Sequence, residues 1–224
     1  MAVWTIAQLV AFLDGVRDDR LFPLWWLAAL RGLRRGELAG LRWMDLSLET
    51  AELVVERQLV QVDGKLVASP PKSAASRRTV ALDRQTVRLL RRHEHDLRRE
   101  RSRRGEPWDD SAGVFIRQDG RTVAPDYLTY RFLKLVEESG LPPVRLHDLR
   151  HGAATMVLAA HVDLPVVQGQ VGHASIVLTA DTYTSVLPEL HHRAAEATAR
   201  LVISAARGTA RKVRRGKCGW MTQV

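Results

Sequence analysis

The sequence has 224 residues, of which 46% are hydrophobic, and a formal net charge of +9. This length allows one large domain or two small ones, and such a positive surplus favours a polyanionic partner, most often nucleic acid, over a merely solvated basic surface. The single cysteine, Cys218, excludes an internal disulfide framework and a cysteine-based zinc site, and is typical of a reducing cytoplasm. No apolar run approaches the ~20 residues that span a bilayer, and we identify no signal peptide.

The N-terminal region predicts three helices. Thr5 followed by Gln8 is a capping-box pattern, which favours a helix over about residues 6–18. Residues 21–30 predict a second, largely buried helix, and residues 34–41 a short third one.

The period then changes to that of β-strands. Residues 52–56 and 59–62 are rich in β-forming side chains, the pair at 63–64 is Asp-Gly, a strong turn signal, and residues 65–68 return as a strand. Residues 78–82 predict one more strand. We therefore expect one small antiparallel sheet.

Asp83 caps a long helix that is expected to run to about residue 101. Its arginines are Arg84, Arg88, Arg91, Arg92, Arg98, Arg99 and Arg101. Only three acidic residues oppose them, so this face suits contact with a DNA backbone, although a solvated helix face is nearly as good an interpretation.

Helices dominate the remainder. The expected elements are a short extended piece at 114–116 and helices over about 125–138, 147–160, 163–170, 175–186 and 188–206. The tail at 207–217 has six basic residues and no acidic ones, so we expect it to be disordered without a partner.

The helix at 147–160 carries two different faces. One stripe collects the apolar residues Leu149, Ala153, Met156 and Ala160. His147, Arg150 and His151 fall roughly opposite. We expect the first face to be buried and the second to present two histidines and a fixed cation together.

Six polar residues are not needed by a buried core: Arg34, Lys72, His147, Arg150, His173 and Tyr183. A guanidinium is always charged and offers a planar fork of donors for phosphate oxygens. Two such groups would neutralise a phosphodiester and hold the extra charge of a five-coordinate phosphorus. Because the set contains no carboxylate cluster, it predicts phosphoryl transfer without a metal or another cofactor.

Each residue alone also has an ordinary structural interpretation. Arg34 could form an ion pair with Glu37 at i,i+3. Lys72 could be a loop residue, His173 a turn residue, and Tyr183 a half-buried core tyrosine.

The two histidines His147 and His151, four residues apart, resemble the zinc pair of a metalloprotease. That motif requires a glutamate where Asp148 stands, and the sequence offers no obvious third ligand. We therefore do not expect a metal site.

The joint pattern is more specific than its parts. In chain order the sequence reads Gly-Leu-Arg34-Arg-Gly-Glu37-Leu, Pro-Lys72-Ser, Arg-Arg-Thr-Val, His147-Asp-Leu-Arg150-His151, Val-Gly-His173-Ala-Ser and Asp-Thr-Tyr183-Thr. This order and spacing closely resemble the catalytic domain of the tyrosine recombinase (phage integrase) family, over about residues 4–206. The resemblance implies a mainly α fold with a small antiparallel β-sheet (α+β).

The resemblance also implies roles for these residues. Tyr183 would attack the scissile phosphate and form a 3′-phosphotyrosyl link, which conserves the energy of the broken ester, so that rejoining needs neither ATP nor a metal. Arg34 and Arg150 would bind the non-bridging oxygens, and Glu37 would support the arginine segment structurally.

Three further residues would move protons or bind phosphate. The resemblance implies that Lys72, on a hairpin turn, protonates the leaving 5′-oxygen. His147 would exchange the tyrosine proton, and His173 would donate a hydrogen bond to the phosphate. The implied partner is double-stranded DNA.

Two features depart from the family pattern. The catalytic domain, expected at 1–206 with the basic tail at 207–224, starts almost at the first residue, so the usual N-terminal core-binding domain is absent from this sequence. Arg31 stands where the family more often has a small polar residue.

The helix at 188–206 resembles the element that packs into a neighbouring protomer in recombination tetramers, although it could equally pack on its own domain.

The functional expectation is a site-specific DNA recombinase or integrase that is cytoplasmic and nucleoid-associated, assembles as a homotetramer on DNA, and has no membrane partner. Two alternatives remain open. One is a nicking-closing enzyme like a type IB topoisomerase, and the other is a catalytically silent DNA-binding remnant.

Overall fold

The computed structural model describes residues 3–71, 76–160, 165–166 and 169, which all belong to one compact unit spanning residues 1–182. Its helices are α1 (Ile6–Gly15), α2 (Phe22–Arg31), α3 (Arg35–Gly40), the 3-10 turn η1 (Trp43–Asp45), α4 (Arg84–Arg103), α5 (Pro125–Ser139) and α6 (Leu146–Ala159). Its strands are β1 (Leu46–Ser47), β2 (Glu52–Val55), β3 (Gln58–Val62), β4 (Lys65–Ser69) and β5 (Arg78–Ala81). The expected α+β class is confirmed.

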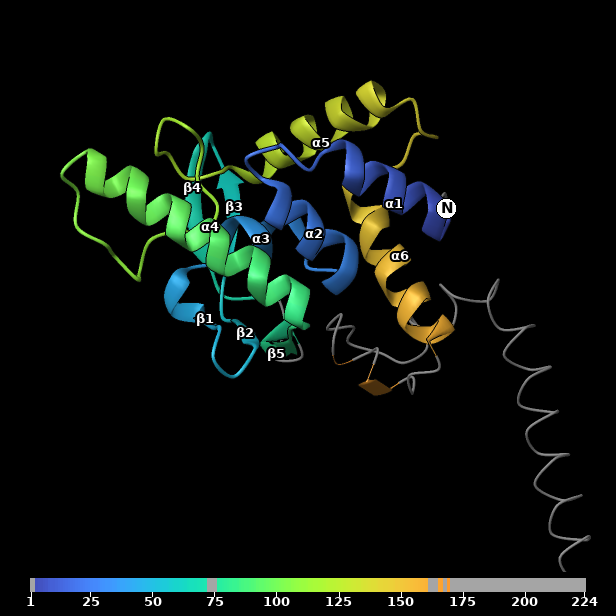
Figure 1. Ribbon diagram of the computed structural model, residues 1–224, viewed down its shortest axis with the longest axis horizontal. Helices are drawn as coiled ribbons and strands as arrows, with labels where there is room; N and C mark the ends of the chain where they lie inside the picture. The colour runs from blue at the N-terminus through green and yellow to red at the C-terminus, as the bar shows by residue number, and fades with distance from the viewer. Residues whose placement is uncertain (1–2, 72–75, 161–164, 167–168, 170–224) are drawn as a thin grey trace, which may run out of the picture. The chain divides into compact units, whose positions relative to one another are not determined.

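An aromatic core joins the helices α1, α2 and α5, which lie close together in Figure 1. Phe12, Trp25 and Phe132 are fully buried, and the ring of Phe132 lies 5.4 Å from Phe12 and 5.9 Å from Trp25. Burial of such rings provides much of the free energy that holds helices together. None of the described helices is both long and apolar enough to cross a membrane.

The strands form two sheets, so the expectation of one sheet was wrong. β2 lies between β1 and β5, both antiparallel to it, whereas β3 and β4 form a separate hairpin. Leu53 of β2 is paired with Val80 of β5, and both are buried. The hairpin turns at Asp63-Gly64, as expected, and both residues have positive φ angles of 48° and 75°, which this turn requires.

The β3–β4 hairpin is fixed to α3 by very close packing. A Cβ atom added to Gly36 would lie 2.7 Å from the carbonyl oxygen of Leu59, and one added to Gly40 would lie 3.1 Å from the Leu59 nitrogen. Only glycine allows a helix to approach a strand backbone this closely. The helix and the hairpin base therefore have little freedom to move apart.

Several expected helices match within a few residues. The Thr5–Gln8 capping box is present, although α1 ends at Gly15 rather than Asp18. Asp83 caps α4 by accepting hydrogen bonds from the backbone nitrogens of Gln85 and Thr86. The short strand β1 was not expected. Residues 165–166 and 169 are helical, but the rest of the expected elements beyond residue 160, and the basic tail, lie outside the described residues.

Candidate active site

Arg34 is held in place by the first turn of α3. It precedes the helix as its N-cap residue, and its backbone nitrogen donates to Glu37 Oε2 at 2.8 Å. Its guanidinium Nη1 donates to Glu37 Oε1, also at 2.8 Å. Glu37 is only 2% exposed. The buried carboxylate of Glu37 therefore holds the side chain of Arg34, which lines a groove on the surface.

Glu37 also binds a second arginine, Arg78 of β5. Nη1 and Nη2 of Arg78 donate to the two carboxylate oxygens at 3.0 and 2.9 Å, and the Arg78 side chain is 6% exposed. Burial alone would raise the pKa of Glu37, but hydrogen bonds and charge from Arg78, together with Arg34, outweigh it and lower the pKa. Sequence reasoning placed Arg78 in a strand and missed this role, because the pairing spans 41 positions.

Arg150 lies inside the protein rather than on an exposed face, so that expectation was wrong. It is 2% exposed, and its Nη1 donates to the carbonyl oxygen of Gly32 at 2.6 Å. Gly32 caps the C-terminus of α2 in the left-handed conformation, with φ of 64°. The C-terminus of a helix carries partial negative charge and favours a cation. This contact accounts for a buried arginine at that position.

The same contact brings the two predicted phosphate-binding arginines to one place. Arg150 contacts the turn at Gly32, and Arg34 follows this turn two residues later. The sequence separates the two arginines by more than a hundred residues, yet α6 and α2 pack directly against each other. Arg150 and the segment that contains Arg34 therefore both lie at the C-terminal end of α2.

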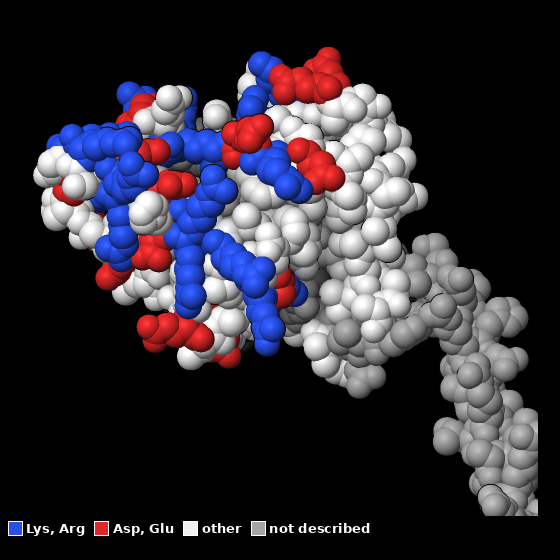
Figure 2. All heavy atoms as spheres, in the orientation of Figure 1, with Lys and Arg blue, Asp and Glu red and all other residues white. Residues whose placement is uncertain are grey.

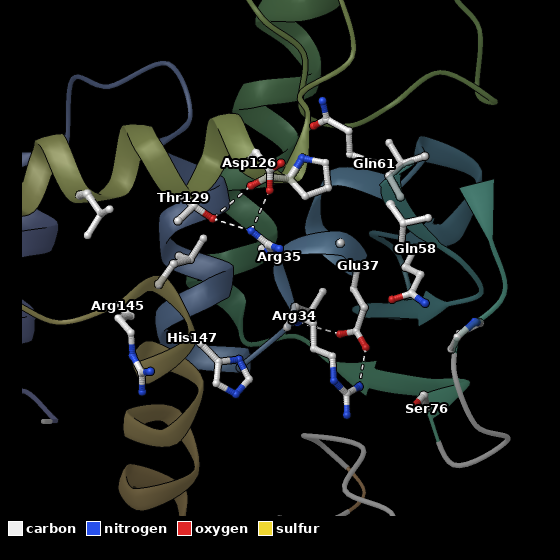
Figure 3. Close-up of a pocket in the computed structure, with 18 residues that line it drawn as sticks. Arg34, Arg35, Glu37, Gln58, Gln61, Ser76, Asp126, Thr129, Arg145 and His147 are labelled. Carbon is white, nitrogen blue, oxygen red and sulfur yellow. Dashed lines mark hydrogen bonds and ion pairs between the residues drawn. The ribbon is translucent and has the colours of Figure 1, made fainter. Parts of the chain in front are cut away.

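His147 stands at the start of α6 beside this pair. Figure 3 shows its ring and the Arg34 guanidinium pointing to the same side of the groove. The pKa of His147 is lowered by partial burial and then by interaction with His151, Arg150 and Arg34, which Asp148 only partly offsets. A lowered pKa favours the neutral imidazole, which is able to accept a proton.

The second histidine, His151, packs its ring edge-on against His147 at 5.0 Å. Its Nδ1 atom is buried and has no hydrogen-bond partner among the described residues, and burial lowers its pKa. Asp148, between the two histidines, accepts from the Arg145 backbone at 2.9 Å and so stabilises the first turn of α6. Across the described ranges, no group of three or more His, Cys, Asp or Glu side chains is arranged to hold a metal ion.

Arg34 and His147 line an open groove of about 740 Å³, whereas the buried Arg150 is not among the residues that line it. Its walls come from α3, β3, the start of α5 and the start of α6 (Figure 3). On the α5 side, Arg35 donates to Asp126 at 2.9 Å and to Thr129 at 3.0 Å. The groove therefore collects three arginines on its walls, Arg34, Arg35 and Arg145.

Arg31 is part of a network behind the groove. It forms an ion pair with Asp83, the N-cap of α4, while its buried Nε atom has no hydrogen-bond partner in the part of the chain that the structure describes. Burial would raise the pKa of Asp83, but the hydrogen bonds from Thr86 and Arg31 lower it to about 2. Arg31 therefore holds the C-terminus of α2 against α4.

Three predicted site residues, Lys72, His173 and Tyr183, lie outside the described residues. Pro71 and Ser76, which flank the segment containing Lys72, both line the groove. Of the six predicted residues, the structure therefore brings together Arg34, His147 and Arg150.

The chain is similar in sequence to known recombinases. The chain is 32% identical over 195 residues to a XerC-like tyrosine recombinase of Caldanaerobacter subterraneus subsp. tengcongensis, a match that covers 82% of this chain and 50% of the relative. It is 25% identical to the ICEBs1 integrase of Bacillus subtilis, over 84% of this chain and 51% of that protein. The chain thus spans about half the length of these curated relatives.

Solved structures agree on the fold. The Tn1549 transposon integrase in complex with transposon right end DNA superposes with a TM-score of 0.71 at 23% identity, over 86% of this chain and 66% of that one. The XerA recombinase gives 0.67 at 22% identity, over 86% and 65% of the two chains. The family model for phage integrases matches residues 5–189, which include all six predicted site residues. The chain therefore belongs to the phage integrase family.

Proposed function

We propose that this chain is the catalytic region of a site-specific DNA recombinase, which breaks and rejoins DNA strands through a covalent link to Tyr183. The observation that carries the proposal is that Arg150 contacts Gly32, two residues before Arg34, and that Arg34 and His147 line the same groove. Family membership supports the same reaction class.

The described residues suit attack on a phosphodiester. In this proposal the guanidinium groups of Arg34 and Arg150 bind the non-bridging oxygens and offset the charge that develops on phosphorus. A free tyrosine has a pKa near 10, so the Tyr183 phenol needs help to lose its proton. A neutral His147 imidazole is able to accept that proton, and the neighbouring cations stabilise the phenolate.

The remaining site residues are assigned by the same proposal. The Tyr183 oxygen forms the bond to phosphorus, the 5′-oxygen leaves, and Lys72 protonates it. His173 donates a hydrogen bond to the phosphate. The position of Pro71 and Ser76 on the groove wall supports the role of Lys72, because both flank its segment.

The proposed partner is double-stranded DNA, bound as a homotetramer in the cytoplasm at the nucleoid. The net charge of +9 suits a polyanion, and several structural neighbours are recombinases in complex with DNA. We further propose that residues 1–206 form the catalytic domain and residues 207–224 a basic tail.

A covalent-capture experiment tests the reaction. The protein is incubated with a pool of nicked duplexes of randomised sequence, in which cleavage releases a short strand and traps the enzyme on DNA. We expect an adduct that survives detergent and is absent in Tyr183→Phe. No adduct from the wild-type chain at high concentration would overturn the proposal in favour of a silent DNA-binding remnant.

The recovered sequences then allow two further measurements. Exchange of strands between two recovered sites supports a recombinase, whereas relaxation of supercoils without exchange would identify a nicking-closing enzyme instead. Arg150→Lys, which keeps the buried charge but loses the planar fork, is expected to abolish the adduct while non-specific DNA binding and the circular dichroism spectrum stay unchanged.

A further inference from the structure

The solvent face of α4 is a continuous stripe of arginines. At about 100° per residue, six arginines fall within a sector of about 120°. They are Arg84, Arg88, Arg91, Arg92, Arg99 and Arg103, and all are exposed. The buried residues of the helix, such as Leu90 and Leu97, lie on the opposite side. We call these six residues the α4 stripe.

The α4 stripe is not neutralised by neighbouring carboxylates. None of its six arginines forms an ion pair with any described residue. By contrast, Arg98 on the flank of the same helix pairs with Glu94 at 2.7 Å and stacks over the ring of Trp108 at 3.9 Å. Acidic partners are therefore available to α4, but they lie beside the stripe and not on it.

This charge pattern destabilises the isolated helix. Arg84 and Arg88, Arg88 and Arg92, and Arg99 and Arg103 each stand four residues apart, where like charges repel. A solvated surface helix gains stability by alternating charges at this spacing. The α4 stripe keeps the repulsion, which a bound polyanion would relieve.

The stripe is also separate from the groove. None of the described residues that line the groove belongs to α4. The buried face of α4 packs on α2, where Trp26 Nε1 donates to Thr86 Oγ1 at 2.9 Å. Figure 2 shows Lys and Arg side chains gathered over α4 on the face turned to the viewer. A ligand on the stripe therefore leaves the groove open.

The chemistry of the stripe selects a duplex. From Arg84 to Arg103 it extends about 28 Å along the helix, and a DNA duplex presents one phosphate charge about every 1.7 Å of its axis. The helix sequence from 84 to 103 contains no Phe, Tyr or Trp, so it lacks the stacking platforms that single-stranded nucleic acids require.

We propose that the α4 stripe binds the sugar-phosphate backbone of a second DNA duplex, in addition to the duplex in the groove. This inference rests on the proposed function for its first duplex. The contacts are made by guanidinium groups to phosphates and carry no sequence information. A single chain would therefore hold two DNA segments, a cleavage segment and a flanking or partner segment.

A paired-variant experiment tests this proposal. Arg88→Gln/Arg92→Gln removes two charges from the stripe and keeps good helix-forming side chains. Arg17→Gln/Arg121→Gln removes two exposed charges elsewhere, from residues paired with Asp14 and Asp119, and serves as the matched control. The probe is a 12-base-pair duplex of arbitrary sequence, and native mass spectrometry counts duplexes per protein chain.

At the same DNA concentration we expect two duplexes per chain for the wild type and the control, and mostly one for the stripe variant, because its second site is weakened. Anisotropy titrations of the weaker site measure how steeply the binding constant falls with salt. In a plot of log K against log salt concentration, each lost arginine should reduce the slope by roughly 0.9. Between about 50 and 200 mM salt, the loss of affinity should therefore be about tenfold smaller for the stripe variant than for the wild type. Covalent capture in the groove should be unchanged.

Three results would overturn the inference. They are one duplex per wild-type chain, equal losses in the stripe and control variants, or complete loss of DNA binding in the stripe variant. The last would make α4 the primary site. If the proposed function were wrong, the wild-type chain would form no covalent adduct, but the number of duplexes bound per chain would be unchanged. The two failures can therefore be told apart.

Discussion

Replacing Glu37 by alanine should destabilise the protein more than any surface charge deletion. Glu37 is 2% exposed and holds the backbone and side chain of Arg34 as well as both guanidinium nitrogens of Arg78. Without it, Arg78 stays buried as a cation without its carboxylate. Removal of one partner from a buried ion pair costs about 3–5 kcal/mol, against a total of about 5–15 kcal/mol for a typical domain.

Urea unfolding followed by tryptophan fluorescence measures this cost, since the chain has six tryptophans. Glu56→Ala is the matched control, because Glu56 pairs with Arg77 at 2.6 Å on the exposed surface, where an ion pair contributes about 0–1 kcal/mol. If Glu37→Ala cost no more than Glu56→Ala, the argument that Glu37 organises the arginine site would be refuted.

The pH dependence provides a second signature of the same carboxylate. The folded-state pKa of Glu37 lies below the ordinary value of 4.5, so the unfolded chain takes up its proton at higher pH than the folded one. The stability from Glu37 is therefore complete above about pH 4.5 and is lost as the pH falls through the lowered pKa. Unfolding of Glu37→Gln should show a weaker dependence in that window.

Three more outcomes follow from the packing and from two other titrating groups. Gly36→Ala should cost about 1–3 kcal/mol, because its Cβ would lie 2.7 Å from the Leu59 oxygen, whereas Gly15→Ala, with no atom within 4 Å, should be neutral or slightly stabilising in the same urea assay. Asp83→Ala should lower the free energy of unfolding by about 0.5–2 kcal/mol through loss of the helix cap. In the wild type, this contribution should disappear as the pH falls from 3.8 towards about 2. Thermal melts across that pH range would detect the loss. Burial lowers the pKa of His93 below 6.5, so wild-type stability should fall as the pH drops below that value, and His93→Gln should reduce the difference between melts at about pH 7 and pH 5.

Local signals in the sequence predicted local structure well. The Thr5–Gln8 capping box and the Asp63-Gly64 turn depend on neighbouring residues alone, and both are present. The division of the strands into two sheets was missed because strand pairing joins distant segments, such as β2 and β5. Periodicity identifies a strand but does not choose its partner.

The candidate site shows the same limit. Arg34 and Glu37, three residues apart, were correctly considered as a possible pair. The burial of Arg150 was not predicted, because helix periodicity placed it opposite the apolar stripe, and its contact with the carbonyl oxygen of Gly32 joins residues 118 positions apart. Arg78 was missed for the same reason. Nothing in its own neighbourhood indicates a buried carboxylate partner.

The glycine contacts between α3 and the β3–β4 hairpin determine where the hairpin can change in length or sequence. The base of the hairpin, at Leu59, is pressed against Gly36 and Gly40 and has no room for a larger side chain or a shifted register. At the tip, a Cβ atom added to Gly64 would meet no described atom within 4 Å beyond its chain neighbours. Insertions at the tip should therefore be tolerated. An insertion or deletion of one residue at the base would displace α3 and, with it, its N-cap residue Arg34.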